Sequence, residues 1–289
     1  MSAASDTSPL EEKVYSFRSR IRHPGEFLLA MSRDVWRSRE LAGQLLQREI
    51  RQRYRQSVLG FFWIVIPPIV TTLIFVMLQK NNIINIQATE IPYPLYVMLG
   101  TVLWQVFTES VLAPLKAFDS CVGIMIKINM PREAPILAGM AQVLFFMGVQ
   151  LLLAVGCLLW FGVTFAPGMV LAPLAVLALV IMGTGIGLFL VPLGGLFKDV
   201  AEGVGMLLRL LFFMTPIVYP PPTGWPWSLL VSLNPIVPVL TAARDLLAKG
   251  VVQEWAPFWF AAGGGVVLLL FGLLFYRITI PVVLERLGA

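Results

Sequence analysis

Charged side chains are missing from long stretches of this 289-residue sequence. Residues 134–197 contain no Asp, Glu, Lys or Arg in 64 consecutive positions. A soluble domain rarely has enough core to bury such a run, whereas one helix needs roughly 20 apolar residues to cross the hydrocarbon layer of a membrane. The cluster at residues 164–168 supplies a turn in the middle of the run. The run therefore predicts two successive membrane-spanning helices.

Cysteine, histidine and nucleotide-binding motifs are scarce or missing. Cys121 falls in a predicted polar loop and Cys157 in a hydrophobic run, so a disulfide between them is not expected. The only histidine is His23, and no Cys/His cluster has the spacing of a metal site. The membrane-spanning runs also lack the series of Asp, Glu or His that carriers driven by protons or sodium use. We therefore expect no catalytic, cofactor or metal site in this chain.

A phosphate-binding loop of the form G-x-x-x-x-G-K-[ST] is also absent from the sequence. Without this loop, and without coupled-ion residues, any energy for transport would have to come from another protein.

Hydrophobic residues make up 58% of the sequence and charged residues 13%. We predict an all-α integral membrane protein in which residues 57–289 form a single transmembrane domain of six helices. Pro67 and Pro68 lie inside the first helix and are expected to kink or break it. The predicted spans are residues 58–78, 93–113, 136–161, 170–196, 203–219 and 257–276.

Lys and Arg are concentrated near the N-terminus, where eleven of the 21 precede Ser57. With the N-terminus inside, 17 basic residues fall on the cytoplasmic side of the predicted spans and three on the other side. The positive-inside rule therefore predicts a multi-pass protein with both termini in the cytoplasm. This distribution argues against a nucleic-acid partner.

The N-terminal region is predicted to contain a cytoplasmic tail at residues 1–33 and an amphipathic interface helix at residues 34–56. Arg48, Arg51 and Arg55 fall on one narrow face of this helix, beside an apolar arc. Such a face can anchor the helix to the headgroups of membrane lipids. Alternatively, the three arginines receive a phosphate-bearing lipid headgroup before transport, because the arginine fork suits phosphate oxygens.

Two charged residues lie inside predicted spans. Glu109 and Arg209 are at comparable depths, and an unpaired arginine in the hydrocarbon layer is costly. We predict that they form an intramembrane polar pair or that Arg209 reaches the interface; direct contact with a substrate is the alternative. Gly183 and Gly187 recur at helical spacing, which indicates close packing between helices.

The connection between spans five and six, residues 220–256, is strongly apolar and is interrupted by prolines. Each half is too short to cross a membrane. This pattern predicts a re-entrant helical pair supported by neighbouring protein. A hydrophobic loop at the interface, with its tryptophans in the aromatic belt, is the alternative.

Aromatic residues cluster at the start of the first span and along the fifth. They are predicted to line a conduit in which sugars slide over flat apolar faces, or alternatively to anchor the helices among lipids. These residues are Tyr54, Phe61, Phe62, Trp63, Phe212, Phe213 and Tyr219.

The segment "REIRQRYRQSVLGFFWIVIPPI" at residues 48–69 resembles the membrane, or permease, subunit of ABC-type polysaccharide exporters, the O-antigen and teichoic-acid export family. Five further motifs follow in the family's order: "YPLYVMLGTVLWQVF" (93–107), "IKINMPRE" (126–133), "FKDV" (197–200), "TPIVYP" (215–220) and "NPIVPVLTAARD" (234–245). In "FKDV", Lys198 departs from the family pattern, where Arg is commoner at this position.

The resemblance implies a homodimer joined by two copies of a cytoplasmic ABC ATPase, which would bind the ATP and Mg. The chain itself would be a transport subunit and not an enzyme. In such exporters a short helix between spans two and three fits a groove of the ATPase. The matching residues here are Ile124, Met125, Ile126, Lys127, Ile128 and Met130.

The resemblance also implies a substrate and a location. The substrate would be a long-chain polysaccharide of the O-antigen type, on polyprenyl pyrophosphate or another lipid anchor, and the protein would lie in a bacterial inner membrane. An ABC exporter of a drug or simple lipid with the same architecture is the alternative. A membrane enzyme acting on polyprenyl lipids is disfavoured, because the candidate acids share no motif: Asp119, Glu133, Asp199 and Glu202.

Overall fold

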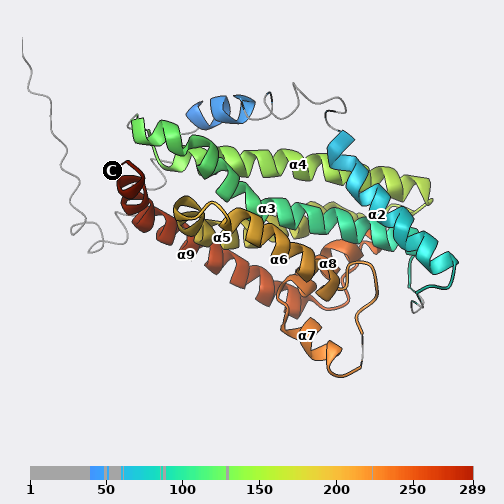
Figure 1. Cartoon of the computed structure of the whole chain (residues 1–289). Helices are drawn as coiled ribbons and strands as arrows, with labels where there is room; N and C mark the ends of the chain where they lie inside the picture. The colour runs from blue at the N-terminus through green and yellow to red at the C-terminus, as the bar shows by residue number, and fades with distance from the viewer. Residues whose placement is uncertain are drawn as a thin grey trace, which may run out of the picture.

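The computed structural model of the chain describes residues 40–48, 51, 60, 62–84, 86, 89–127, 130–222 and 224–288. These residues form a bundle of long helices, and none of them is in a β-strand (Figure 1). The short segment of residues 40–48 is also helical. The elements are α2 (Phe62–Lys80), α3 (Tyr93–Lys127), α4 (Glu133–Trp160), the 3₁₀ helix η1 (Pro167–Leu171), α5 (Ala172–Leu196), α6 (Val200–Met214), α7 (Trp227–Leu233), α8 (Ile236–Lys249) and α9 (Trp255–Gly288).

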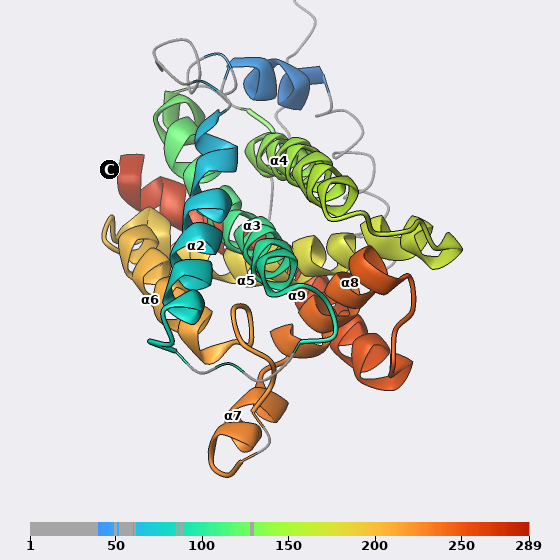
Figure 2. The ribbon, with the colours of Figure 1, turned by 90° about the vertical axis from the view of Figure 1, so that its right-hand side faces the viewer.

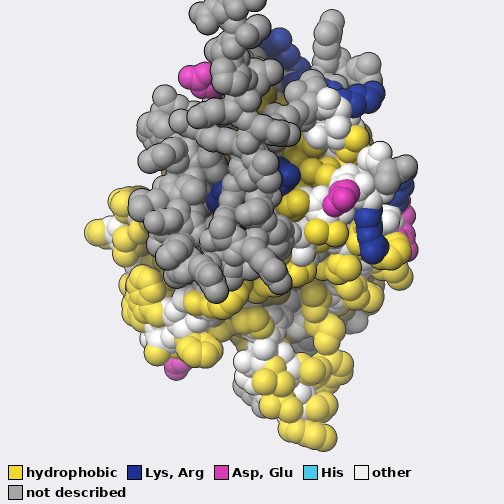
Figure 3. Space-filling view, turned by 90° about the vertical axis from the view of Figure 1, so that its left-hand side faces the viewer, with side chains coloured by type: hydrophobic (Ala, Val, Ile, Leu, Met, Phe, Trp, Pro, Cys, Tyr) yellow, Lys and Arg dark blue, Asp and Glu magenta, His cyan; other side chains and the backbone are white. Residues whose placement is uncertain are grey.

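The two ends of the bundle differ in which helix ends and loops lie there. The last turns of α3 and α9 and the start of α4 lie at one end, here called the C-terminal end (Figure 1). The loop after α2, helix α7 and the end of α8 lie at the other, here called the α7 end. Figure 3 faces the C-terminal end, where Lys and Arg side chains lie in the upper part of the described surface and hydrophobic side chains cover much of the surface below.

Five helical segments are long and apolar enough to cross a membrane: α2, α3, α4, Pro167–Leu196 and α9. The predicted all-α integral membrane fold is therefore confirmed. Helices α3 and α9 have 35 and 34 residues, which corresponds to about 50 Å at 1.5 Å per residue. Because the hydrocarbon layer is only about 30 Å thick, both helices extend beyond it.

The predicted fifth span at residues 203–219 is only partly correct. Its helix, α6, has 15 residues and ends at Met214, so it covers roughly 22 Å. Thr215 precedes Pro216 and has an extended backbone, with φ −97° and ψ 137°, as expected for a residue that precedes proline. The last five predicted helical residues therefore form an irregular segment.

The predicted helical pair after this segment is present as α7 and α8, which meet at an angle of 84°. The two helices differ in their surroundings. Ten of the fourteen residues of α8 are buried, whereas α7 buries none and protrudes from the bundle (Figure 2). Only α8 therefore has the neighbouring protein that a re-entrant helix needs.

Helices α3 and α5 form the centre of the bundle, and most of their membrane-spanning length is buried. Figure 2 shows α3 surrounded by the other helices. Glycines allow α5 to lie close to α3 and α9 at the same time. A Cβ atom at Gly187 would lie 2.4 Å from the Val111 carbonyl oxygen, and one at Gly185 would lie 2.8 Å from the Leu269 nitrogen. The packing role predicted for Gly183 and Gly187 agrees with these distances.

Helix α2 is held to the bundle along one narrow face. Its buried residues are Ile64, Pro68 and Thr72, which are four positions apart and therefore lie in one row. The helix runs without interruption through Pro67 and Pro68. Of the kink or break predicted at these prolines, the break does not occur.

Candidate functional site

A cavity of about 730 Å³ lies between α2, α3 and α6, with one residue of α4 on its wall. Aromatic rings form much of this wall. They come from four helices and are Trp63, Phe75, Trp104, Phe146, Phe212 and Phe213. Polar side chains also line the cavity: Thr71, Thr101, Gln105, Thr108, Glu109 and Arg209.

The predicted conduit residues are partly brought together in this cavity. Trp63, Phe212 and Phe213 line it, whereas Phe62 is exposed outside it and Tyr219 lies beyond the end of α6. Two further predicted residues, Tyr54 and Phe61, lie outside the described residues. Sequence reasoning missed Phe75, Trp104 and Phe146, because single aromatic residues within long apolar helices carry no signal that distinguishes a cavity wall from lipid contact.

Contacts between rings fix the orientation of this wall. The Trp104 ring lies 5.4 Å from Phe107 and 6.2 Å from Phe212 between ring centroids. Phe212 and Phe213 are 5.2 Å apart and nearly perpendicular, at 86°. Such edge-to-face pairs add to the stability that burial provides. The result is a set of flat apolar faces with a few polar groups between them, suited to binding rings that carry both hydroxyl and C–H surfaces.

The charged residues of the cavity are not paired as predicted. Glu109 forms an ion pair with Lys116, seven positions further along α3, with 3.1 Å between Nζ and Oε2. Arg209 is exposed, and no ion pair joins it to Glu109 in the described part of the chain. The two residues line the same cavity, but the predicted intramembrane pair is not formed, because Lys116 reaches Glu109 from the same helix.

Residues 215–220 connect α6 to the loop before α7 and are here called the strap. Pro216 and Pro220 have no N–H group, so the strap cannot form a regular helix. Side chains of α3 and α8 instead bind four consecutive carbonyl groups of the strap. Arg244 donates to the carbonyls of Pro216 and Ile217 at 3.0 and 3.1 Å. Tyr93 and Tyr96 donate to those of Val218 and Tyr219 at 3.0 and 3.1 Å.

This arrangement meets a strict requirement of membrane proteins, in which backbone polar groups need partners within the protein. The strap also supports the cavity, because the Tyr219 hydroxyl donates to the Phe213 carbonyl at 2.7 Å. Asn234 reaches the other end of the strap, donating to the Thr215 hydroxyl at 3.1 Å. The contacts of α3 and α8 with the strap therefore determine where the aromatic end of α6 lies.

Arg244 is the residue whose role sequence reasoning missed most clearly. The charge count placed it in the connection between spans five and six, on the side opposite the termini, but it is only 2% exposed. Its guanidinium carbon lies 3.9 Å from the centroid of the Tyr96 ring, which is a cation–π contact. Gly100 leaves space for it, because a Cβ there would lie 2.6 Å from Nη2 of Arg244. The spacing of Tyr93, Tyr96 and Gly100 on one face of α3 was the available signal.

The residues predicted to contact an ATPase lie at the C-terminal end of the bundle. Residues 124–127 are not a separate short helix, because they form the last turn of α3. Met125 is buried and Ile126 is 43% exposed. Ile128 lies outside the described residues. A second cavity, of about 500 Å³, adjoins this turn and contains Met125, Ile126 and Met130 together with Arg132, Pro281, Leu284, Glu285 and Gly288.

Two contacts join α9 to the beginning of α4 beside this second cavity. The Tyr276 hydroxyl donates to the Arg132 carbonyl at 2.7 Å, and Arg277 lies 3.5 Å from the Glu133 carboxylate. The ends of α3, α4 and α9 are therefore connected. Lys127, also in the predicted set, is exposed. These ends present apolar and charged side chains together, as surfaces that bind proteins commonly do.

The three arginines predicted to receive a lipid phosphate are only partly described. Arg48 and Arg51 are exposed, and Arg55 lies outside the described residues. The helix of residues 40–48 packs through Ala42 and Leu45 against the core at the C-terminal end. This packing leaves Arg48 on an exposed part of the surface. In the described part of the chain, no group of three or more His, Cys, Asp or Glu side chains could hold a metal ion.

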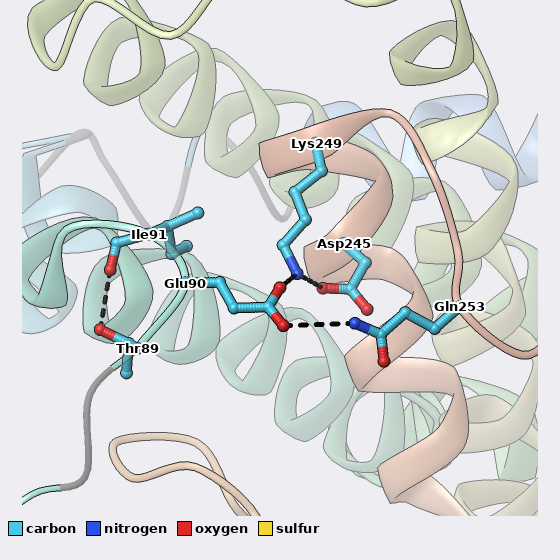
Figure 4. A network of polar contacts seen from close by, with 6 residues as sticks. All are labelled: Thr89, Glu90, Ile91, Asp245, Lys249 and Gln253. Atoms are coloured by element: carbon cyan, nitrogen blue, oxygen red, sulfur yellow. Dashed lines mark hydrogen bonds and ion pairs between the residues drawn. The ribbon is translucent and has the colours of Figure 1, made fainter.

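A polar network at the α7 end joins the loop before α3 to the end of α8 (Figure 4). Lys249 forms ion pairs with Glu90 and with Asp245, and Gln253 donates to Glu90 at 3.4 Å. Thr89 donates to the Ile91 carbonyl at 2.7 Å within the same loop. The hydrogen bond from Lys249 and its positive charge hold the pKa of Glu90 below its ordinary value.

This pKa shift predicts a small effect of pH on stability. Because the pKa is lower in the folded protein, the contribution of Glu90 is present at neutral pH and is lost as the carboxylate gains a proton. We expect the wild-type protein to melt slightly above a Glu90→Gln variant at pH 7, and the difference to vanish between about pH 5 and pH 3. Melting curves of both proteins across this range test the prediction; a difference that does not change with pH would contradict it.

With this geometry described, we compared the chain with known proteins. Residues 40–248 match the family described as ABC-2 type transporter. The match covers more than half of the chain and includes α2 to α7, the strap and all of α8 except its last residue. This chain belongs to the ABC-2 type transporter family. The matched residues include the lining of the aromatic cavity and the last turn of α3.

Individual ABC-2 relatives are similar over most of their length. The O-antigen export system permease protein RfbA of Myxococcus xanthus is 28% identical over 253 residues, which cover 84% of this chain and 93% of that protein. A permease of the same name from Klebsiella pneumoniae is 26% identical, covering 72% and 80%. The polysialic acid transport protein KpsM of Escherichia coli is 24% identical, covering 81% and 91%.

Proposed function

We propose that this chain is the transmembrane subunit of an ATP-driven exporter that moves a lipid-linked or long-chain polysaccharide, similar to O-antigen, across a bacterial inner membrane. The observation that carries the proposal is the aromatic cavity between α2, α3 and α6. Aromatic faces bind sugar rings through their C–H surfaces without holding each hydroxyl group, so a repeating polymer can advance. The names of the relatives, O-antigen export permease and polysialic acid transport protein, support the same class of substrate.

The proposed orientation places the C-terminal end of the bundle in the cytoplasm. The excess of Lys and Arg in the connections and termini at this end supports that orientation through the positive-inside rule. The α7 end, with the strap and the Glu90 network, would then face the other side. In this orientation a glycan enters near the helix of residues 40–48 and leaves beside α7.

Two copies of the chain would form the conduit, and two copies of a cytoplasmic ABC ATPase would drive it with ATP and Mg. The large apolar surfaces of α2 and α6 support the homodimer, because these two cavity walls bury few of their residues in one copy. The exposed last turn of α3, with the cavity beside α9, supports an ATPase contact at the C-terminal end. Closure of the ATPase pair would be transmitted through α3, which reaches from this turn to the strap.

The lipid anchor would enter near the N-terminal helix. Exposure of Arg48 and Arg51 supports their assignment, with Arg55, to the phosphate of a polyprenyl pyrophosphate or another lipid-linked glycan. Arg209 on the cavity wall adds a positive charge further along the proposed path. A simple lipid or drug would not need the length of aromatic wall that four helices provide.

The proposal is tested by tagging the full chain and purifying it under gentle extraction from native membranes. We expect an ABC ATPase to remain bound at one copy per copy of the chain. In cells that lack the chain, lipid-linked glycan should accumulate on the cytoplasmic side and return to the surface on complementation. Normal surface glycan in the deletion strain, or purification without an ATPase, would refute the proposal; accumulation of a simple lipid instead would favour the drug or lipid exporter.

A further inference from the structure

Helix α2 forms the longest part of the cavity wall, but it should be weakened at its centre. In an unbroken helix the Ile64 carbonyl accepts a hydrogen bond from the N–H of residue 68. Residue 68 is proline and has no N–H group, and Pro67 removes the corresponding bond to Trp63. Ile64 is buried, so its carbonyl needs another donor within the protein.

That donor is Gln150 of α4, which lies opposite the proline pair. Its Nε2 atom donates to the Ile64 carbonyl at 3.1 Å and to Oε1 of Gln105 on α3 at 2.6 Å. Gln150 has no exposed surface. One amide nitrogen therefore connects three helices, and its two hydrogen atoms serve two acceptors in different helices.

The chemistry of the acceptors determines the orientation of both amides. A carbonyl oxygen accepts and cannot donate, so the atom of Gln150 that faces Ile64 is its nitrogen. The atom of Gln105 that faces the same nitrogen is then its oxygen. The NH₂ group of Gln105, whose side chain lines the cavity, is thereby left for contents of the cavity. The oxygen of Gln150 has no hydrogen-bond partner, so this buried residue is used as a donor.

A fully buried glutamine among apolar helices is costly unless its polar atoms find partners. We infer that Gln150 is a positioning residue of the cavity, which replaces the hydrogen bond that Pro68 removes from α2 and holds both this wall and the Gln105 amide in place. This inference rests on the proposed function only in treating the cavity as the transport path. It also explains why α2 continues through two prolines that were expected to kink or break it.

The test uses Gln150→Met, which keeps the length of the side chain and removes its donors. The full chain is expressed with its ATPase, and surface glycan is measured at matched membrane levels. Without Gln150, the buried Ile64 carbonyl has no donor. The fraction of molecules in which α2 keeps its position in the cavity wall should therefore fall, and export with it, by about tenfold. A general loss of packing would have a similar effect, so a second substitution is needed to identify the cause.

Pro68→Ala provides that second substitution, because residue 68 then donates to Ile64 within the helix. Adding it to Gln150→Met should restore most of the export. Pro67→Ala is the matched control: it restores the bond to Trp63 and should leave the defect unchanged. Normal export in Gln150→Met alone would overturn the inference, as would rescue by neither proline substitution or by both equally.

If Gln150→Met does not accumulate in membranes, the same comparison is read from protein level and from the melting temperature of extracted protein. Recovery with Pro68→Ala, but not with Pro67→Ala, supports the inference, and any other pattern overturns it. Failure of the proposed function is recognised separately. Wild-type cells would then show no export that depends on this chain, while the melting temperatures would still report on the contact between Gln150 and Ile64.

Discussion

Replacing Arg244 by Met should destabilise the protein more than any other single substitution on its α7 end. The change removes the donors to the Pro216 and Ile217 carbonyls and the contact with the Tyr96 ring. Buried groups that lose hydrogen bonds to a charged donor cost about 1–3 kcal/mol each, so we expect the free energy of unfolding to fall by about 3 kcal/mol. Export should be lost as well, because the strap positions the aromatic end of α6.

One effect opposes this expectation. Nε and Nη1 of Arg244 have no hydrogen-bond partner, and an apolar residue would remove these unsatisfied groups. Buried charges can for this reason be replaced without loss in some proteins. Here the carbonyls decide the outcome, because the prolines within the strap cannot supply N–H donors and neighbouring side chains already serve the carbonyls of Val218 and Tyr219. Met would leave two acceptors without partners.

The experiment compares melting temperatures of purified Arg244→Met and Arg209→Met proteins, followed by export in cells. Arg209 is a matched control, since it is an arginine on a membrane helix but is exposed, and its replacement should change stability by less than about 0.5 kcal/mol. Arg244→Lys should fall between the two, because one ammonium group cannot reproduce the planar fork. Equal melting temperatures for the Arg244 and Arg209 variants would show that the strap does not depend on Arg244.

The contrast between these two arginines shows which features of the fold could be predicted from the sequence. Both lie in apolar surroundings, and the spans themselves were predictable because insertion depends mainly on the length of an apolar run. Which charge is buried depends instead on contacts between segments far apart in the chain. Arg244 is more than 140 positions from Tyr96, and no spacing within one sequence measures that distance. The charge count therefore gave only the side of the membrane for Arg244 and did not show that it is buried.

The positions at which helices end were also only partly predictable from the sequence. Pro216 ends α6 early because local backbone geometry cannot be overridden there, whereas Pro68 does not end α2 because Gln150 supplies a donor from another helix. Two prolines in similar apolar segments thus have opposite results. The predicted fifth span ran past Pro216 to residue 219, although the local restriction on a residue before proline would have ended the helix there. For α2, only the three-dimensional arrangement explains the result.

At the C-terminal end, the structure changes which substitution best tests the contact with an ATPase. Met125 and Ile126 both belong to the set that the resemblance implies for this contact. Met125 is only 8% exposed, so a charge there would disturb the core of the bundle and would not test the contact. Ile126 is 43% exposed in the same turn and lies beside Gly288 of α9, whose added Cβ would be 3.4 Å from Ile126 Cγ2. It is accessible without being essential for packing.

Ile126→Glu should therefore abolish export while leaving the folded membrane subunit intact. A charge placed in a desolvated apolar contact commonly costs 2 kcal/mol or more, which corresponds to a loss of about 30-fold in binding. We would measure surface glycan, co-purification of the ATPase and the melting temperature of the membrane subunit. Ile83→Glu is the matched control, since Ile83 is also exposed but belongs to the loop that follows α2, at the opposite end of the bundle. Normal export with Ile126→Glu, or an equal loss with Ile83→Glu, would remove the last turn of α3 from the proposed path between ATP hydrolysis and glycan movement.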